Sequence, residues 1–160
     1  MINIREYQET DSEAVTDLLK EFLSYTKKQY DKEVLEFETF SDADKDAYAK
    51  NLHASFTNIE NSHFLIAENQ ENIIGYILGC IQTQEFKVCK KTGYIQSFFV
   101  SQNNRGAGIG KKLYSALTNW FAKHGCDSLE LNVYAGNTAT IETYKKWGFK
   151  LNSLKMKKKL

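Results

Sequence analysis

Three glycines alternate with other residues between Asn104 and Lys111, and this spacing is the strongest chemical signal in the sequence. An apolar run, residues 94–100, precedes the segment, and apolar residues at helical spacing follow it, which predicts a strand, a glycine-rich loop and a helix. Those helical residues are Ile109, Leu113, Ala116, Leu117, Trp120 and Phe121. Glycine lets the backbone approach a ligand closely, and a helix start presents unpaired N–H groups and a positive dipole to an anion. Because Arg105 and Lys111 add positive charge on either side, we expect the loop to bind phosphate, in particular a pyrophosphate.

Two other phosphate-binding loops are excluded by their spacing. The loop of ATP- and GTP-binding proteins requires Gly-x-x-x-x-Gly-Lys-Ser/Thr. Counting back from Gly110, its first glycine position holds Arg105, and its Ser/Thr position holds Lys112. The dinucleotide fingerprint requires Gly-x-Gly-x-x-Gly, and its third glycine would fall on Lys111. A glycine-rich connection without any ligand remains the alternative interpretation.

The region around the glycines resembles a known family. Val100, followed after four residues by the segment 105–113, is similar to the acetyl-CoA signature of the GNAT superfamily of N-acetyltransferases. The core of that signature, Arg/Gln-x-x-Gly-x-Gly/Ala, matches at Arg105, Gly108 and Gly110. A second segment, residues 137–149, resembles the Asn-x-x-Ala-Ile-x-x-Tyr-x-x-x-Gly-Phe element of the family. The resemblance covers the second half of the chain well and the first half only in the order of its elements.

The resemblance implies acetyl-CoA (coenzyme A) as the cofactor. The backbone N–H groups of residues 106–111 are expected to bind its pyrophosphate, and free backbone groups near Phe98 and Val100 are expected to pair with the pantetheine arm. Asn137 is expected to fix the cofactor near that arm. The full set of expected cofactor-binding residues is Phe98, Phe99, Val100, Arg105, Gly106, Ala107, Gly108, Ile109, Gly110, Lys111, Asn137 and Tyr144. A bulky residue at position 108 is expected to obstruct the phosphate and raise KM for acetyl-CoA.

Tyr144 is the candidate catalytic residue, as a general acid for the departing thiolate. A phenol titrates near pH 10 and a thiol near 8.5, so at about pH 7 the phenol keeps the proton that it can donate. The alternative is a helix tyrosine that packs on the sheet. The general base stays open, because Gln96 stands where many relatives carry glutamate and an amide cannot accept the proton. A water chain or another acid would have to act, and the acids considered are Glu85, Glu130 and Glu142.

The family resemblance predicts transfer of acetyl to a primary amine, and we expect a small-molecule acceptor of the polyamine, amino acid or aminoglycoside type. A protein N-terminus or lysine, and a non-catalytic acyl-CoA-binding regulatory module, are the alternatives. Residues 31–46 contain seven acids and two lysines, which would attract a cationic amine or simply form a solvated loop. Tyr25 and Phe37 are candidates to line an acceptor pocket.

The composition predicts a single domain over residues 1–160, because 160 residues with 42% hydrophobic content is near the commonest domain size. A net charge of +1 gives no reason to expect a nucleic-acid partner. The three cysteines show no metal-binding spacing, so no metal site is expected. No signal peptide or bilayer-spanning run is evident, which predicts a cytoplasmic protein without a membrane partner. Since dimers are common in the family, a homodimer is also considered.

The periodicity of the chain predicts the order β-α-α-β-β-β-α-β-α-β-β and thus a mixed α/β fold. The last two strands, residues 149–151 and 154–157, would form a closing hairpin. We therefore expect a central, twisted, mostly antiparallel mixed sheet of about 6–7 strands flanked by about four helices. The resemblance adds that this is the GNAT-like acyl-CoA N-acyltransferase fold, in which the strands ending at Val100 and near Tyr134 splay apart around the cofactor.

Overall fold

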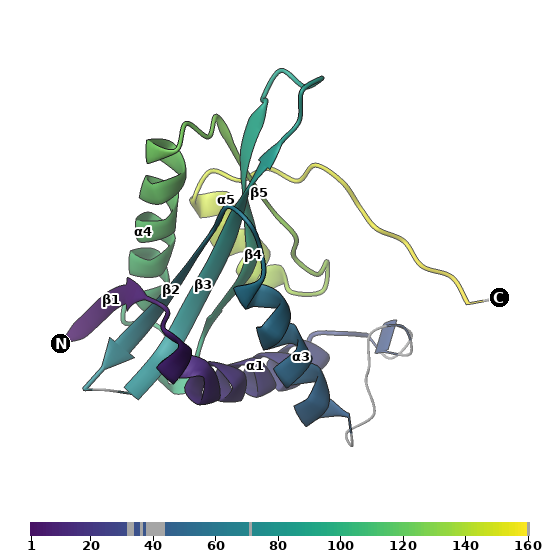
Figure 1. The fold of residues 1–160 in the computed structure, drawn as a ribbon. Coiled ribbons are helices and arrows are strands. Elements are labelled where there is room, and N and C mark those ends of the chain that lie inside the picture. The colour runs from purple at the N-terminus through teal and green to yellow at the C-terminus, as the bar shows by residue number, and fades with distance from the viewer. Residues whose placement is uncertain (32–33, 36, 38–43, 71, 160) are drawn as a thin grey trace.

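The computed structural model describes residues 1–31, 34–35, 37, 44–70 and 72–159. Its elements follow the expected order as far as the last helix (Figure 1). They are β1 (Ile2–Glu6), α1 (Ser12–Lys27), α3 (Lys45–Thr57), β2 (Ser62–Asn69), β3 (Asn72–Thr83), β4 (Lys91–Val100), α4 (Ile109–Lys123), β5 (Ser128–Leu131) and α5 (Thr138–Lys146). Two short 3-10 helices, Glu9–Asp11 and Gln102–Asn104, precede α1 and the glycine loop.

The sheet has the spatial order β1-β2-β3-β4-β5, so neighbours along the chain are also neighbours in space. The pairs from β1 to β4 are antiparallel, and β5 pairs with β4 in parallel. The expected mixed, mostly antiparallel sheet is confirmed. The strand number was too high, since the described residues form five strands instead of about 6–7.

Helices cover both faces of the sheet (Figure 1). Alternation along β3 sends Tyr76 and Leu78 into a core with α1 and α3, and sends Ile77 into a second core with α4. The glycines of the middle strands let α4 approach closely. A Cβ atom at Gly79 would lie 2.5 Å from Cζ of Phe121, which is shorter than any packing contact allows. A larger residue than glycine at position 79 would therefore clash with α4.

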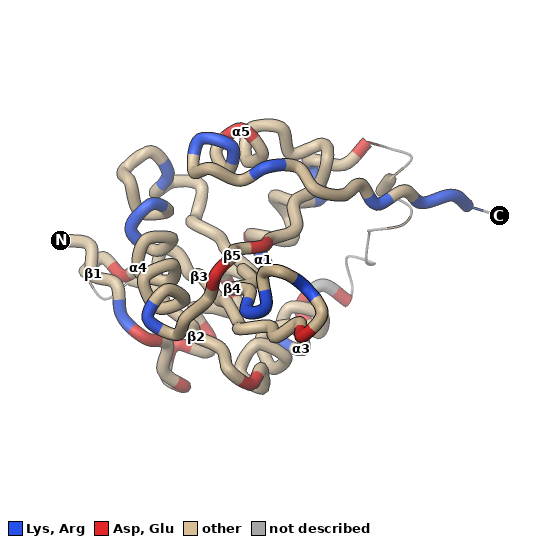
Figure 2. The backbone as a smooth tube through the Cα atoms, turned by 90° about the horizontal axis from the view of Figure 1, so that it is seen from above, with Lys and Arg blue, Asp and Glu red and all other residues tan. Residues whose placement is uncertain are grey.

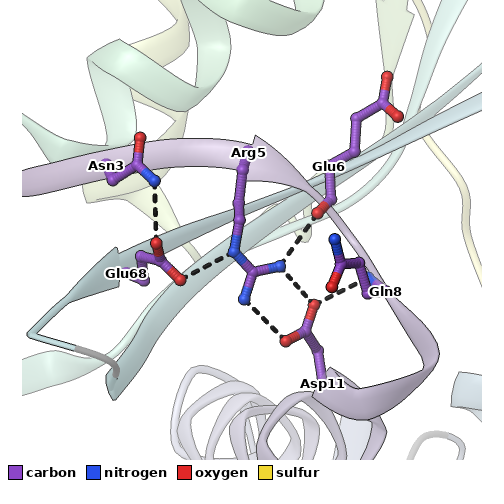
Figure 3. A network of polar contacts seen from close by, with 6 residues as sticks. All are labelled: Asn3, Arg5, Glu6, Gln8, Asp11 and Glu68. Atoms are coloured by element: carbon purple, nitrogen blue, oxygen red, sulfur yellow. Dashed lines mark hydrogen bonds and ion pairs between the residues drawn. The ribbon is translucent and has the colours of Figure 1, made fainter.

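An ion-pair network fixes the start of α1 to the first two strands (Figure 3). Arg5 donates to Glu68 Oε2 at 2.8 Å and to both carboxylate oxygens of Asp11, at 2.7 and 2.8 Å. The backbone N–H of Gln8 also donates to Asp11, and Asn3 donates to Glu68. The hydrogen bonds from Arg5 are the largest cause that holds the pKa of the Asp11 carboxyl below its usual range.

The expected closing hairpin at residues 149–151 and 154–157 is wrong. The chain after α5 forms no strand up to residue 159 and extends away from the sheet (Figure 1). Leu151, Leu154 and Met156 are 66%, 78% and 92% exposed. The physical reason is that two strands of three and four residues, with few apolar side chains and several lysines, bury too little surface to stabilise a hairpin.

Lys and Arg positions occur along the C-terminal tail, whereas α5 and the other elements carry both signs of charge (Figure 2). Within the part of the chain that the structure describes, no helix combines the length and the apolar composition needed to cross a bilayer.

Candidate active site

The site begins where β4 and β5 separate. Their pairing ends at Ile95 opposite Leu131. Beyond this point β4 continues to Val100, whereas the chain leaves the sheet after Leu131. The structure thus has the expected splayed pair, although the second strand ends at Leu131 instead of near Tyr134. The edge of β4 that faced β5 therefore has no neighbouring strand, among the described elements, over residues 96–100.

A β-bulge lies at the point of separation. In the pairing of β3 with β4, Gly79 is opposite Ile95 and Leu78 is opposite Ser97, so Gln96 has no partner. A bulge leaves one residue unpaired and bends its strand. Gln96, which stands where many relatives carry glutamate, is therefore the bulged residue, and it lines the opening.

A cleft of 1240 Å³ occupies the opening and brings together nearly all of the expected cofactor-binding residues. The expected residues that line it are Phe98, Phe99, Val100, Arg105, Gly106, Gly108, Ile109, Gly110, Lys111, Asn137 and Tyr144. Ala107 is not among the described lining residues, and its side chain is exposed. The two motifs, which are about thirty residues apart in the sequence, therefore meet at one cavity.

The backbone N–H groups of the glycine loop lie at the start of α4, which no side chain caps. Gly106 and Gly108 have positive φ angles of 84° and 75°, a conformation that favours glycine. Gly108 is the N-cap of α4, and no side chain caps it. Within the described part of the chain, no N–H group of residues 106–111 has a hydrogen-bond acceptor. Unpaired N–H groups at a helix start form a ready anion site.

The other cofactor-binding candidates make contacts within the protein. Phe99 is buried in the core beneath α1, so only its backbone is available to a ligand. The Val100 carbonyl oxygen accepts a hydrogen bond of 2.9 Å from Nε of Arg105. Asn137 Oδ1 accepts from the backbone N–H of Thr140 at 3.3 Å and thereby caps α5. Asn137 therefore has a structural contact beside the role expected from the motif.

Tyr144 lies in an aromatic cluster at the cleft wall. Its ring centroid is 5.7 Å from those of Trp147 and Phe149. Burial, with a smaller contribution from Tyr114, raises the pKa of Tyr144 to about 12. Tyr144 lines the cleft, and its hydroxyl makes no hydrogen bond within the described part of the chain. The phenol is therefore protonated at neutral pH and available to donate a proton or hydrogen bond to a ligand.

Comparison with known proteins agrees with this geometry. A family model described as "Acetyltransferase (GNAT) family" matches residues 14–149. The chain belongs to this acetyltransferase family. The match includes both motifs and most of the described fold, and it makes the protein an acetyl-CoA-dependent N-acetyltransferase.

Individual relatives of this acetyltransferase are distant. The uncharacterized N-acetyltransferase YycN of Bacillus subtilis is 24% identical over 150 residues, which cover 91% of this chain and 94% of the relative. The spermine/spermidine N(1)-acetyltransferase of B. subtilis is 30% identical over 60 residues, 37% of this chain and 40% of that protein. A crystal structure of a mutant BH1408 protein from Bacillus halodurans has a TM-score of 0.80 at 23% identity and covers 99% of both chains.

The acetyltransferase has no evident general base in the described part of its cleft. None of the described lining residues is Asp, Glu or His. Glu85, Glu130 and Glu142, which the sequence left open as bases, do not line it. Glu142 instead accepts a hydrogen bond of 2.7 Å from Lys145 on the outer face of α5.

The cleft wall opposite the expected cofactor-binding residues comes from α1, from the residues just after it and from the loop after β5. The sequence did not predict most of these residues as part of the site. The rings of Tyr30 and Tyr134 meet edge to face, with centroids 4.5 Å apart. A Cβ atom at Gly136 would lie 2.5 Å from the carbonyl oxygen of Gln29, so a glycine is needed where this loop meets the end of α1. Gly136 was the one local signal for this contact, and nothing in the sequence paired Tyr30 with Tyr134.

Of the two residues that the sequence suggested for the acceptor pocket, one lines the cleft. Tyr25 lines the cleft, and Phe37 is not among its described lining residues. Much of the acidic stretch 31–46 lies outside the described residues. Of its described acids, Asp31, Asp44 and Asp46, none lines the cleft.

Proposed function

We propose that this acetyltransferase transfers the acetyl group of acetyl-CoA to a primary amine of a small molecule, by direct attack on the thioester. The observation that carries the proposal is one cleft that contains both the uncapped N-terminus of α4 and the unbonded hydroxyl of Tyr144. The first is suited to a diphosphate and the second to a departing thiolate.

The coenzyme would be held mainly by backbone groups. In this proposal, the unpaired N–H groups of residues 106–111 bind the diphosphate, and Lys111 adds a positive charge at the same wall. The pantetheine arm lies along the edge of β4 over Phe98–Val100, where no described strand competes for the backbone. Asn137 closes the site at the start of α5. This pose directs the thioester toward the bulge at Gln96 and toward Tyr144.

The reaction then needs one bond to form and one to break. The neutral amine nitrogen attacks the thioester carbon, and the amine proton leaves to water. As the tetrahedral intermediate collapses, the C–S bond breaks, and the Tyr144 hydroxyl donates its proton to the sulfur. Because the pKa of Tyr144 is about 12, the phenol regains its proton readily from solvent before the next cycle.

The acceptor is proposed to be an amine of the polyamine, amino acid or aminoglycoside type. The spermine/spermidine acetyltransferase of B. subtilis supports a polyamine, because its name states such an acceptor. The described wall of the cleft includes the rings of Tyr30 and Tyr134, and aromatic faces attract ammonium groups.

A thiol-release assay with acetyl-CoA tests the proposal. The panel contains spermidine, spermine, amino acids, an aminoglycoside, and a peptide with a free N-terminus and a lysine. We expect amine-dependent release of coenzyme A that is fastest with one of the small amines. Release only with the peptide would replace the small-molecule acceptor by a protein. Coenzyme binding without release on any amine would contradict catalysis and favour an acyl-CoA-binding regulatory module.

A further inference from the structure

We infer that Arg105 is a positioning residue that joins the coenzyme loop to the acceptor wall through Tyr25; this rests on the function proposed above. Arg105 opens the glycine loop, and Tyr25 lies in the C-terminal half of α1. Cζ of Arg105 is 4.1 Å from the centroid of the Tyr25 ring. Its Nε donates to the Val100 carbonyl oxygen at 2.9 Å, so the guanidinium is fixed to the end of β4 while it covers the ring.

The aromatic side chains under Arg105 connect this contact to the core. Cζ of Arg105 is 5.2 Å from the ring centroid of Phe99, which is buried. The ring centroids of Tyr25 and Phe22 are 6.2 and 5.7 Å from that of Phe99. A planar guanidinium can stack on a ring and donate a hydrogen bond at the same time, which a lysine ammonium cannot reproduce. The position therefore requires arginine specifically, beyond its positive charge.

A second contact holds the same two segments together one helical turn away. Glu21 Oε1 accepts a hydrogen bond of 2.8 Å from the backbone N–H of Gln102, just before the glycine loop. Glu21 and Tyr25 are four residues apart and so lie on one face of α1. The loop is thus attached to α1 at two successive turns, and α1 continues as the cleft wall that includes Phe22.

These contacts predict that coenzyme binding and acceptor binding are coupled. A diphosphate that orders the loop also fixes Arg105, and Arg105 fixes the position of α1. Coupling of this kind is reciprocal, so a change on the acceptor wall must alter affinity for the coenzyme. An exposed cation–π contact corresponds to a change of about two- to five-fold in affinity.

Calorimetric titration of coenzyme A into variants of Tyr25 tests the inference. Tyr25→Leu keeps an apolar side chain but removes the ring face, and we expect Kd to rise about two- to five-fold. Tyr25→Phe keeps the ring and should retain the wild-type Kd. Thermal unfolding checks that each variant is folded, and Glu21→Ala, which removes the second contact, should weaken binding if Tyr25→Leu does not fold.

Arg105→Lys completes the test, alone and combined with Tyr25→Leu. The double variant should bind coenzyme A no more weakly than Arg105→Lys alone. The reason is that Arg105→Lys already removes the contact between Arg105 and the Tyr25 ring, so Tyr25→Leu has no further contact to remove. Arg105→Lys should also raise KM for the amine identified in the panel more than it lowers kcat. Wild-type affinity in Tyr25→Leu, or losses that add in the double variant, would overturn the coupling alone. A wild-type protein that binds no coenzyme A would instead overturn the coenzyme site itself, and the coupling with it.

Discussion

At the scale of single residues, Tyr144 carries the chemistry of the proposal. Its hydroxyl has no partner in the described part of the chain, and burial keeps it protonated by raising its pKa to about 12. Tyr144→Phe removes only the proton donor. We expect kcat to fall by about 10²–10⁴-fold with little change in KM for acetyl-CoA, measured by steady-state thiol release.

Tyr114→Phe is the matched control for this prediction. Tyr114 belongs to the same aromatic cluster, where its ring stacks on Trp147 with centroids 4.4 Å apart, but it does not line the cleft. The control should retain kcat. Equal losses in the two variants would show that the cluster matters only for packing.

The pH dependence of the reaction reports on whether the enzyme supplies a base. None of the described cleft-lining residues is Asp, Glu or His, and without a base on the enzyme the rate follows the fraction of acceptor amine that is already neutral in solution. We expect kcat/KM to rise about tenfold per pH unit toward the pKa of the acceptor amine, near 10 for an alkylamine. Because the pKa of Tyr144 is raised to about 12, this phenol loses its proton only at a pH above the pKa of the amine. A plateau that begins between about pH 5 and 7 would reveal a base on the enzyme.

The residues that the sequence predicted share one property, since they belong to short contiguous motifs. Gly106 and Gly108 are recognisable because their positive φ angles favour glycine whatever the rest of the fold does. The partnership of Arg105 with Tyr25 was not predictable, because it joins segments eighty residues apart in the chain. The same reason hid the contact of Tyr30 with Tyr134.

At the scale of elements, the junction of β1, β2 and α1 depends on Asp11. Its pKa is lowered in the folded state, mainly by the hydrogen bonds from Arg5. A lowered pKa stabilises the fold above the unfolded pKa, near 3.9, and that contribution is lost as pH falls through the folded value. Asp11→Asn should therefore unfold more easily at pH 7, and its free energy of unfolding should decrease less steeply below about pH 5 than that of the wild type.

Urea unfolding at several pH values measures this difference. Asp17→Asn is the control, because Asp17 is exposed and pairs only with Lys20 on the surface of α1 among the contacts seen. An exposed ion pair contributes little to stability. Parallel pH curves for wild type and Asp11→Asn would contradict the assigned role of the junction.

Most elements were predictable because their hydrophobic periodicity is regular. The helices that cover the sheet show apolar residues at helical spacing, and β2 to β4 are apolar runs bounded by polar turns. The bulge at Gln96 was not predictable, since it depends on how β3 and β4 align. The hairpin predicted for the tail was wrong for a related reason. Pairing of a final strand depends on tertiary contacts that a local pattern cannot show.

At the scale of the whole molecule, the tail is expected to contribute little to the stability of the fold. Leu151, Leu154 and Met156 are exposed, and no strand forms after α5 among the described residues. A chain that stops after Lys150 should differ from the full chain by no more than about 0.5 kcal/mol in free energy of unfolding. Chemical denaturation of both forms measures this difference. If the shortened chain lost several kcal/mol in free energy of unfolding, the tail would have to pair with the sheet.

The central claim is that the start of α4 binds the diphosphate of coenzyme A. Gly108 and Gly125 provide a matched pair, since their φ angles are 75° and 74° and an added Cβ meets no protein atom within 4 Å at either position. Valine should therefore strain both backbones similarly, but only Gly108 lies at the cleft.

Titration calorimetry with coenzyme A on wild type, Gly108→Val and Gly125→Val is the most direct measurement. We predict binding to the wild type, at least tenfold weaker binding to Gly108→Val as an order-of-magnitude expectation for lost phosphate contacts, and wild-type binding to Gly125→Val. No binding to the folded wild type, or equal binding to all three proteins, would contradict the account.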